Sequence, residues 1–302
     1  STYYDSCRCS HSLFMHHFIR EKGRLIKLEL KAKNKIFEGS HQVFSHWSES
    51  TKCEMTFSIY LPTVNRFEDT PTLFWLSGLT CTEENFRVKS GVQRYASAMG
   101  VNIIAPDTSP RGENVPDDPN YDFAQGAGFY LDAMQSPWDE NFKMYSYITN
   151  DLLNIAKNNF SINEDKLGIF GHSMGGHGAL TIALKNPDIF KSVSAFAPIC
   201  APTQVPWGRN AFEKYLGSDE ESWQQYDATQ LIHDKGWSSD ILVDQGLEDE
   251  FMDEHLKPEL LEDACIKNDI SLSLRKHEGY DHSYFFISSF IEDHISWHKE
   301  RL

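Results

Sequence analysis

Apolar side chains recur along the chain in the two patterns that distinguish strands from helices. Residues 53–62 alternate apolar and polar side chains with a period of two, which indicates a strand. Residues 72–78 and 101–107 are continuous apolar runs that end in turn residues, as strands buried on both faces do. Further strands are predicted at residues 166–171, 192–198, 240–246 and 271–279.

Segments with helical periodicity separate these strands. We predict helices at residues 89–100, 143–160, 175–187, 255–268 and 283–300. This alternation of strand and helix calls for a mostly parallel central sheet with helices on both faces, which is an α/β fold. No linker rich in Gly, Ser or Pro divides the pattern, so we predict a single domain over residues 35–302.

The first 34 residues do not continue this pattern. They are polar, mixed in charge and without sustained periodicity, apart from a short apolar alternation at residues 24–30. We therefore expect a loosely ordered N-terminal extension over residues 1–34. Cys7 and Cys9 form a C-x-C pair, but no second pair or histidine doublet follows at zinc spacing, so no metal site is predicted.

The charge composition of the chain argues against two classes of binding partner, nucleic acids and anionic membranes. The 302 residues include 28 Lys and Arg against 44 Asp and Glu, a formal net charge of −16. Nucleic acids and anionic membranes attract basic patches, so neither is an expected partner. The six cysteines are scattered, which favours a reducing compartment, and no run approaches the ~18 apolar residues of a membrane span. We expect a cytoplasmic protein.

A G-x-S-x-G pentapeptide at residues 171–175 is the motif that indicates chemistry. It falls directly between a predicted strand and a predicted helix, which is the context of a nucleophile elbow. In that turn the serine adopts strained backbone angles, and small flanking residues let the strand and the helix approach closely. Ser173 is therefore the candidate nucleophile; a glycine-rich turn with a surface serine is the alternative.

The histidines after Ser173 are candidates for its general base. A serine hydroxyl needs a base within hydrogen-bond reach, and in α/β-hydrolases the acid and then the histidine follow the serine along the chain. His282 is best placed, in a turn between the last predicted strand and the last predicted helix. His277 lies on or just beyond that strand, so we assign it a packing or surface role.

Two aspartates are candidates for the acid that orients His282. Asp249 lies in the loop after the buried strand at residues 240–246, where a catalytic acid is expected, and it is our choice. Asp244 belongs to the end of that strand, where its carboxylate can tie down the turn. The other acidic residues of the loop are expected to be solvated: Glu248, Glu250 and Asp253.

Two backbone amides are candidates for the oxyanion hole. In this fold one N–H belongs to the residue after the nucleophile, here Met174, and the second comes from the loop after an earlier strand. Leu79 follows the apolar run that begins at Thr72 and is the natural supplier. Backbone donors leave no side-chain signature, so position alone supports this assignment.

Nine strings, in order along the chain, together resemble the S-formylglutathione hydrolase family, also called the esterase D family. They are LSGLTCTEENF, APDTSPRG, GAGFYLDA, MYSYITNDL, GHSMGGHGAL, SVSAFAPI, PWGRNAFEKYLG, DILVDQGLEDEF and EGYDHSYFFISSFI. The resemblance extends from about Lys35 to near the C-terminus. It implies an α/β-hydrolase fold without cofactor or metal, in which the five residues proposed above form the triad and the oxyanion hole.

The family hydrolyses S-formylglutathione to glutathione and formate in formaldehyde detoxification. The resemblance therefore implies a small glutathione thioester as partner, a formyl-serine intermediate on Ser173, and a homodimer. Two alternatives remain. One is a general short-acyl carboxylesterase or acyltransferase on the same scaffold; the other is a non-catalytic binding protein of this fold, a class that normally lacks the Ser or the His.

A glutathione thioester is anionic, so it needs a local basic or amide-rich patch on a chain whose net charge would repel it. Arg111 and Arg209 are candidates, although each is commonly a surface or ion-pair residue. Trp207, in a Pro-Trp-Gly turn, is a candidate pocket wall, with a core aromatic as the alternative. Cys81, two residues after Leu79, is a further candidate for a substrate-binding residue. The alternative is that it is an inert buried cysteine.

Overall fold

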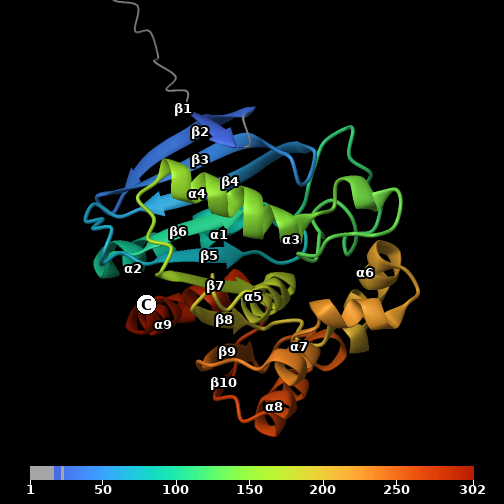
Figure 1. Ribbon diagram of the computed structural model, residues 1–302. Helices are drawn as coiled ribbons and strands as arrows, with labels where there is room; N and C mark the ends of the chain where they lie inside the picture. Colours follow the sequence, from blue (N-terminus) through green and yellow to red (C-terminus); the bar gives the residue numbers. More distant parts are fainter. Residues whose placement is uncertain (1–16, 22–23) are drawn as a thin grey trace, which may run out of the picture.

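The computed structural model describes residues 17–21 and 24–302, with side chains from Lys27 onward (Figure 1). The predicted C-x-C pair, Cys7 and Cys9, lies outside the described residues. The strands join into a ten-stranded sheet in the order β1-β2-β3-β4-β6-β5-β7-β8-β9-β10. They are β1 (His17–Glu21), β2 (Arg24–Ile36), β3 (Gly39–Ser48), β4 (Cys53–Leu61), β5 (Thr72–Leu76), β6 (Asn102–Pro106), β7 (Leu167–His172), β8 (Ser192–Phe196), β9 (Ile241–Gly246) and β10 (Leu272–His277).

The part of the sheet from β6 to β10 is parallel. Each neighbouring pair in the order β6-β5-β7-β8-β9-β10 runs in the same direction. The strands β1 to β4 add an antiparallel extension at the other edge. Every side chain of β5, β6, β7, β8 and β9 is buried, which explains their continuous apolar runs. The predicted mostly parallel sheet of an α/β-hydrolase fold is confirmed.

Helices cover both faces of the sheet. The helix α5 packs on β5, β7 and β8, whereas α9 packs on β8, β9 and the helix α2. Figure 1 shows α4 and α5 in front of the sheet and α9 behind it. The α-helices are α1 (Glu83–Lys89), α2 (Val92–Met99), α3 (Met144–Ser146), α4 (Leu153–Asn159), α5 (Met174–Lys185), α6 (Pro206–Leu216), α7 (Ala228–Lys235), α8 (Pro258–Lys267) and α9 (Tyr284–Arg301).

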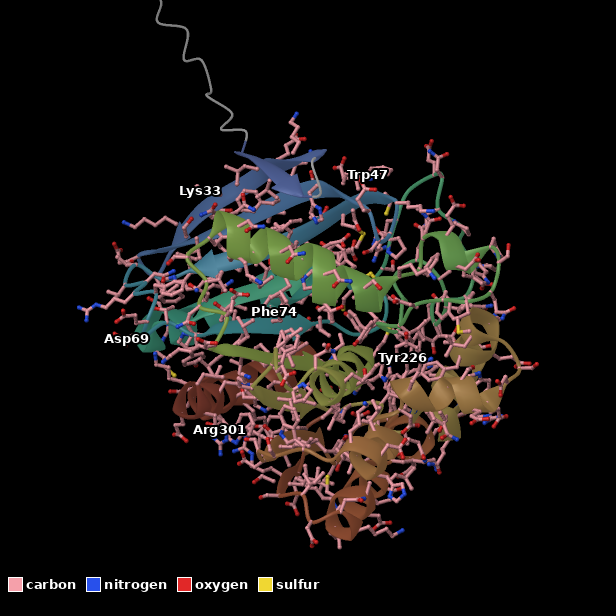
Figure 2. The ribbon with its side chains drawn as sticks, viewed as in Figure 1. Lys33, Trp47, Asp69, Phe74, Tyr226 and Arg301 are labelled. Carbon is pink, nitrogen blue, oxygen red and sulfur yellow. The ribbon has the colours of Figure 1, made fainter. Side chains whose placement is uncertain are left out.

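The central strand β5 shows how the two faces are filled. Successive side chains of a strand point to opposite faces, so Phe74 and Trp75 belong to different layers. Phe74 packs edge-on against Phe190, with ring centroids 5.4 Å apart, and Figure 2 shows it in the interior. Trp75 stacks on Phe86 of α1, with ring centroids 4.0 Å apart. Aromatic contacts of this kind fix the position of β5, whose last residue precedes the loop of the candidate oxyanion hole.

The sheet begins earlier than the sequence pattern indicated. β2 starts at Arg24 and pairs with β3 from Glu29 to Ile36, so the expected boundary at residue 34 falls inside a strand. Residues 24–34 therefore belong to the sheet rather than to a loosely ordered extension. Leu28 and Leu30 alternate with polar residues, but Ala32 and Asn34 continue the series with a small and a polar side chain, so the alternation is too short to indicate a long strand.

A chain of buried polar side chains ties β8 and β9 to α9. His294 Nε2 donates to Asp244 Oδ2 at 2.7 Å, because a carboxylate can only accept. His294 Nδ1 then accepts from Ser194 Oγ at 2.8 Å. Ser194 Oγ accepts in turn from His298 Nε2 at 2.8 Å, and His298 Nδ1 accepts from Ser192 Oγ at 2.6 Å. With both histidines neutral, each hydrogen bond in this chain has one donor and one acceptor.

Burial keeps these histidines neutral. It lowers the pKa of His294, although the bond to Asp244 opposes the shift, and it lowers the pKa of His298 well below the usual range. Burial alone would raise the pKa of Asp244, but the hydrogen bonds from His294 and Arg275 outweigh it and hold that pKa below its usual range. Burial lowers the pKa of five further histidines: His41, His46, His172, His177 and His255.

We expect the stability of the protein to fall on acidification. A histidine whose pKa is lowered in the folded state takes up its proton first in the unfolded chain. The free energy of unfolding therefore decreases as the pH falls below about 6.5, by up to ~1.4 kcal/mol per pH unit for each such histidine. Urea unfolding at about pH 7.5 and about pH 5.5 measures this decrease.

Two variants make this prediction specific. His298→Gln removes a buried titrating group and should show a shallower decrease than the wild type. His233→Gln, at an exposed position on α7, should retain the wild-type decrease. A urea midpoint that is the same at both pH values would contradict the expected role of the buried histidines.

Candidate active site

Ser173 occupies the sharp turn between β7 and α5. Its backbone has φ 57° and ψ −117°, a strained conformation for a residue with a side chain. Three hydrogen bonds hold it there: its N–H donates to Phe196 O at 3.0 Å, and its carbonyl accepts from the N–H groups of His177 at 3.0 Å and Ile199 at 3.2 Å. The turn therefore has the geometry expected of a nucleophile elbow.

The flanking glycines are required by close packing rather than by their own backbone angles. A Cβ at Gly175 would overlap the carbonyl of Leu76 at the end of β5. A Cβ at Gly171 would overlap the carbonyl of Gly175. The residues Met174 to Leu184 of α5 are all buried, so the helix cannot shift outward to relieve such a clash.

His282 and Asp249 form the hydrogen-bonded pair that the sequence analysis selected. The Nδ1–H of His282 donates to Asp249 Oδ2 at 2.6 Å, which leaves Nε2 as the unprotonated ring nitrogen. Asp249 is buried and accepts two further bonds, from Gln245 Nε2 at 3.1 Å and from the Phe251 N–H at 2.9 Å. His282 lines the same cavity as Ser173. The geometry is that of an imidazole oriented by a carboxylate beside a serine.

The rejected candidates belong to a different cluster. Asp244 accepts from His277 Nε2 at 3.0 Å and from the Arg275 guanidinium at 2.6 and 2.7 Å. His277 also stacks on Phe290 of α9, with ring centroids 3.8 Å apart. Neither Asp244 nor His277 is among the residues that line the cavity of Ser173. Their role is to join β9 and β10 to α9, the elements whose loops present Asp249 and His282.

The loop after β5, which carries Leu79, lies against the elbow, and Leu79 and Ser173 line the same cavity. Tyr130 Oη donates to Ser77 O at 2.7 Å, and the Thr80 N–H donates to Gly126 O at 2.9 Å. Gly78 lies so close to the elbow that a Cβ there would be 3.3 Å from Ser173 Cβ. Within residues 27–302, the N–H groups of Leu79 and Met174 donate to no other protein group, so both are free to bind an oxyanion.

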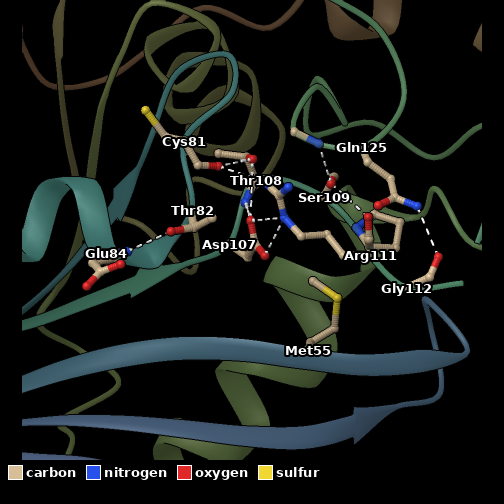
Figure 3. A network of polar contacts seen from close by, with 12 residues as sticks. Met55, Cys81, Thr82, Glu84, Asp107, Thr108, Ser109, Arg111, Gly112 and Gln125 are labelled. Carbon is tan, nitrogen blue, oxygen red and sulfur yellow. Dashed lines mark hydrogen bonds and ion pairs between the residues drawn. The ribbon is translucent and has the colours of Figure 1, made fainter. Parts of the chain in front are cut away.

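Arg111 supports this loop and does not line the cavity. Its Nε donates to Asp107 at 2.9 and 3.1 Å, and its Nη2 donates to Cys81 O at 3.1 Å (Figure 3). Thr108 Oγ1 also donates to Cys81 O, at 2.5 Å. The substrate-binding role suggested from the sequence does not fit this arrangement, because the guanidinium already binds a carboxylate and a carbonyl of the protein.

The remaining substrate-site candidates separate into two groups. Trp207 lines the cavity, stacks on His255 with ring centroids 3.8 Å apart, and donates from Nε1 to Tyr121 Oη at 3.1 Å. Cys81 also lines the cavity, and burial raises the pKa of its thiol. Arg209 instead pairs with Glu220 on the surface, at 2.5 Å, away from the cavity.

The cavity that contains Ser173 has a volume of about 320 Å³. Its walls are aromatic, and its floor is formed by the elbow and by the loop after β5. The lining residues are Gly78, Leu79, Thr80, Cys81, Asn85, Lys89, Tyr121, His172, Ser173, Trp207, Phe251, His282 and Tyr284. A mostly apolar hollow with a few convergent polar groups is the usual form of a small-molecule site.

Several of these residues were not found from the sequence. The ring of His172 lies 4.3 Å from that of His282, centroid to centroid, and its Nε2 is buried without a hydrogen-bond partner. Burial and the nearby His282 lower the pKa of His172 well below the usual range, so it stays neutral. Gln245, which bonds Asp249, was also missed. In the sequence, only its position between Asp244 and Asp249, four residues before Asp249, could have indicated that it contacts the candidate acid.

Within residues 27–302, no group of three or more His, Cys, Asp or Glu side chains is placed to hold a metal ion. No helix of the described chain combines the length and the apolar character needed to span a bilayer.

Comparisons with known proteins agree with this geometry. The family described as "Putative esterase" matches residues 48–297. An S-formylglutathione hydrolase from Agrobacterium tumefaciens is 50% identical, with a TM-score of 0.89, over 90% of this chain and 99% of that chain.

The chain belongs to this esterase family. It is a serine hydrolase, and the resemblance noted in the sequence is confirmed. Two more distant structures share the fold of this esterase. An S-formylglutathione hydrolase from Staphylococcus aureus is 18% identical, with a TM-score of 0.67, over 86% of this chain and 99% of that chain. A ferulic acid esterase from Anaeromyces mucronatus is 18% identical, with a TM-score of 0.58, over 91% of this chain and 92% of that chain.

The Arg111–Asp107 pair yields a prediction about the oxyanion loop. Arg111→Met leaves the Asp107 carboxylate buried without its main partner, which should reduce the free energy of unfolding by about 2–3 kcal/mol. It also removes one of the two donors to the Cys81 carbonyl, the other being Thr108 Oγ1, so kcat should fall as the loop is held less firmly. Chemical denaturation and steady-state kinetics on a short-acyl aryl ester measure the two effects.

The double variant Arg111→Met/Asp107→Asn is the matched control. It removes the unpaired charge and should recover part of the stability, while kcat stays low because Cys81 O still lacks the hydrogen bond from Arg111. Recovery of wild-type kcat in the double variant would show that Arg111 acts through folding alone.

Proposed function

We propose that this esterase hydrolyses S-formylglutathione to glutathione and formate, with Ser173 as nucleophile. The 50% identity to the Agrobacterium tumefaciens S-formylglutathione hydrolase, over 90% of the chain, is the observation that carries the proposal. The hydrogen-bonded pair of His282 and Asp249, in reach of the same cavity as the strained Ser173, supplies the chemistry.

In the first half of the reaction, Ser173 attacks the formyl carbonyl. His282 Nε2 takes the hydroxyl proton, and the carbonyl electron pair moves onto oxygen, where the N–H groups of Leu79 and Met174 stabilise it. Collapse of the tetrahedral intermediate breaks the C–S bond and leaves formyl-Ser173. A thiol of pKa about 8.5 is a good leaving group, so it departs with little assistance and takes up the proton from His282.

Water completes the second half of the reaction. His282 removes a proton from water as the resulting hydroxide attacks the formyl ester. The intermediate collapses to formic acid and free Ser173, which recovers its proton from His282. The formic acid then releases its remaining proton to solvent and becomes formate. In both halves the imidazolium is stabilised by Asp249, whose two other hydrogen bonds, from Gln245 and the Phe251 N–H, hold the carboxylate in position.

The aromatic residues that line the cavity favour substrates with a small acyl group. Trp207 and Phe251 contact one another, with ring centroids 4.7 Å apart, and Phe251 also packs edge-on against His282 at 5.1 Å. These rings crowd the space around the reacting atoms. A formyl group requires almost no acyl pocket, so specificity is expected to come from the thiol part of the substrate.

The wider setting of the reaction is also part of the proposal. The reaction is expected to belong to the glutathione-dependent route of formaldehyde detoxification. The enzyme is expected to act in the cytoplasm as a homodimer. Within the described chain Cys53, Cys81, Cys200 and Cys265 are free thiols, as expected in a reducing compartment.

Initial rates on two substrates test this proposal. We expect wild-type kcat/KM to be higher for S-formylglutathione than for a short-acyl aryl ester. Ser173→Ala should lower kcat on both by about 10⁴-fold or more, because the nucleophile is lost while the fold is retained. Thermal unfolding of the variant is the control for folding.

Different outcomes identify different errors. Efficient hydrolysis of the aryl ester with poor hydrolysis of S-formylglutathione would leave Ser173 as nucleophile and favour a general short-acyl carboxylesterase. Retention of activity in Ser173→Ala would refute the nucleophile itself.

A further inference from the structure

The charge of the cavity differs from that of the protein as a whole. The chain carries a net charge of −16, and a glutathione thioester carries two carboxylates and one ammonium group. Among the described residues that line the cavity, however, none is acidic and one is cationic, Lys89. The local field at the cavity is therefore set by Lys89 against an acidic background.

Lys89 is not neutralised by a neighbouring acid. The carboxylates of α1 are engaged elsewhere on the helix, since Glu83 and Glu84 pair with Arg87 at 3.3 and 3.5 Å. Within residues 27–302, Lys89 forms no ion pair. Its Nζ lies 5.9 Å from the centre of the Tyr284 ring, another wall of the cavity, and the side chain is exposed.

Asn85 supplies a second donor on the same face of α1. Residues four apart lie one above the other on a helix, so Asn85 and Lys89 are neighbours, and both line the cavity. Asn85 Oδ1 accepts from the Thr82 N–H at 2.9 Å in the capping box of α1. This bond fixes which end of the amide is the oxygen, and the Nδ2 donors remain for a ligand.

The other basic residues suggested by the sequence are already engaged. Arg111 binds Asp107 and the Cys81 carbonyl, and Arg209 binds Glu220. Neither lines the cavity. The ammonium of Lys89 and the amide of Asn85 are thus a pair of donors at one end of a cavity that has the nucleophile at its floor.

We propose that Lys89 and Asn85 bind a carboxylate of the leaving thiol and so make the enzyme selective for acyl thioesters of anionic thiols. This inference rests on the proposed function and names the group that recognises the glutathionyl part. The ammonium provides the attraction, and the amide donor fixes the orientation of the carboxylate beside α1.

Kinetics on a pair of substrates that differ only in charge test the proposal. The pair consists of S-formylglutathione and the same thioester with both carboxylates esterified. The ratio of kcat/KM for the anionic substrate to that for the neutral one should fall about tenfold in Lys89→Met, equivalent to about 1.4 kcal/mol. The loss should appear in KM, because the contact is present in both the ground state and the transition state.

Matched variants separate a specific contact from net charge. Lys89→Arg retains the positive charge and should keep most of the preference. Lys191→Met removes one positive charge from an exposed position at the amino-terminal end of β8, whereas the cavity lies beyond the carboxyl ends of β5 and β7. That variant should keep the wild-type ratio, and an equal loss in it would overturn the assignment to Lys89.

Inhibition by free glutathione separates failure of this proposal from failure of the proposed function. With a neutral short-acyl aryl ester as substrate, glutathione should inhibit the wild type, and its inhibition constant should rise about tenfold in Lys89→Met. This result holds whether or not S-formylglutathione is turned over. Equal inhibition of both proteins, or no inhibition of the wild type, would overturn the role of Lys89.

Discussion

The close contact of β5, β7 and α5 at the nucleophile elbow is the constraint on which the site depends. Gly171 and Gly175 admit no side chain, because the carbonyls of Gly175 and Leu76 occupy that space. The contact holds Ser173 at φ 57° and leaves the Met174 N–H unpaired at the start of a buried helix. It also brings the loop after β5 against the serine, so one packing arrangement positions both the proposed nucleophile and the proposed oxyanion donors.

The other two residues of the proposed triad, Asp249 and His282, are held by a second, polar arrangement around Asp244. The hydrogen bonds of Asp244 to Arg275, His277 and His294 connect β9, β10 and α9. The loops that leave β9 and β10 are also joined directly, since the Glu248 N–H donates to Tyr280 O at 2.9 Å. Asp249 and His282 therefore stand on loops with little freedom to separate, as a catalytic pair requires.

Much of the fold could be predicted because β5, β7, β8 and β9 are buried on both faces and appear as continuous apolar runs. β2 and β3 were not recognised, because the apolar alternation of β2 weakens at Ala32 and Asn34 and polar residues interrupt that of β3. The elbow and the Asp249–His282 pair follow from chain order in an α/β-hydrolase. For Arg111 the sequence left a substrate-binding role and an ion-pair role open, because a sequence shows a charge but not its partner, and the structure shows the ion pair with Asp107. Lys89 was missed because its place in the cavity lining depends on the packing of the fold.

The central claim is that Ser173 is a nucleophile activated by His282 and Asp249. Labelling with a fluorophosphonate, followed by peptide mass spectrometry, tests it most directly, because the reagent reacts with an activated serine and reports its position. The account predicts stoichiometric modification of Ser173 in the wild type and loss of labelling in His282→Ala. Modification of a different serine, or no labelling of a protein with full esterase activity, would contradict it.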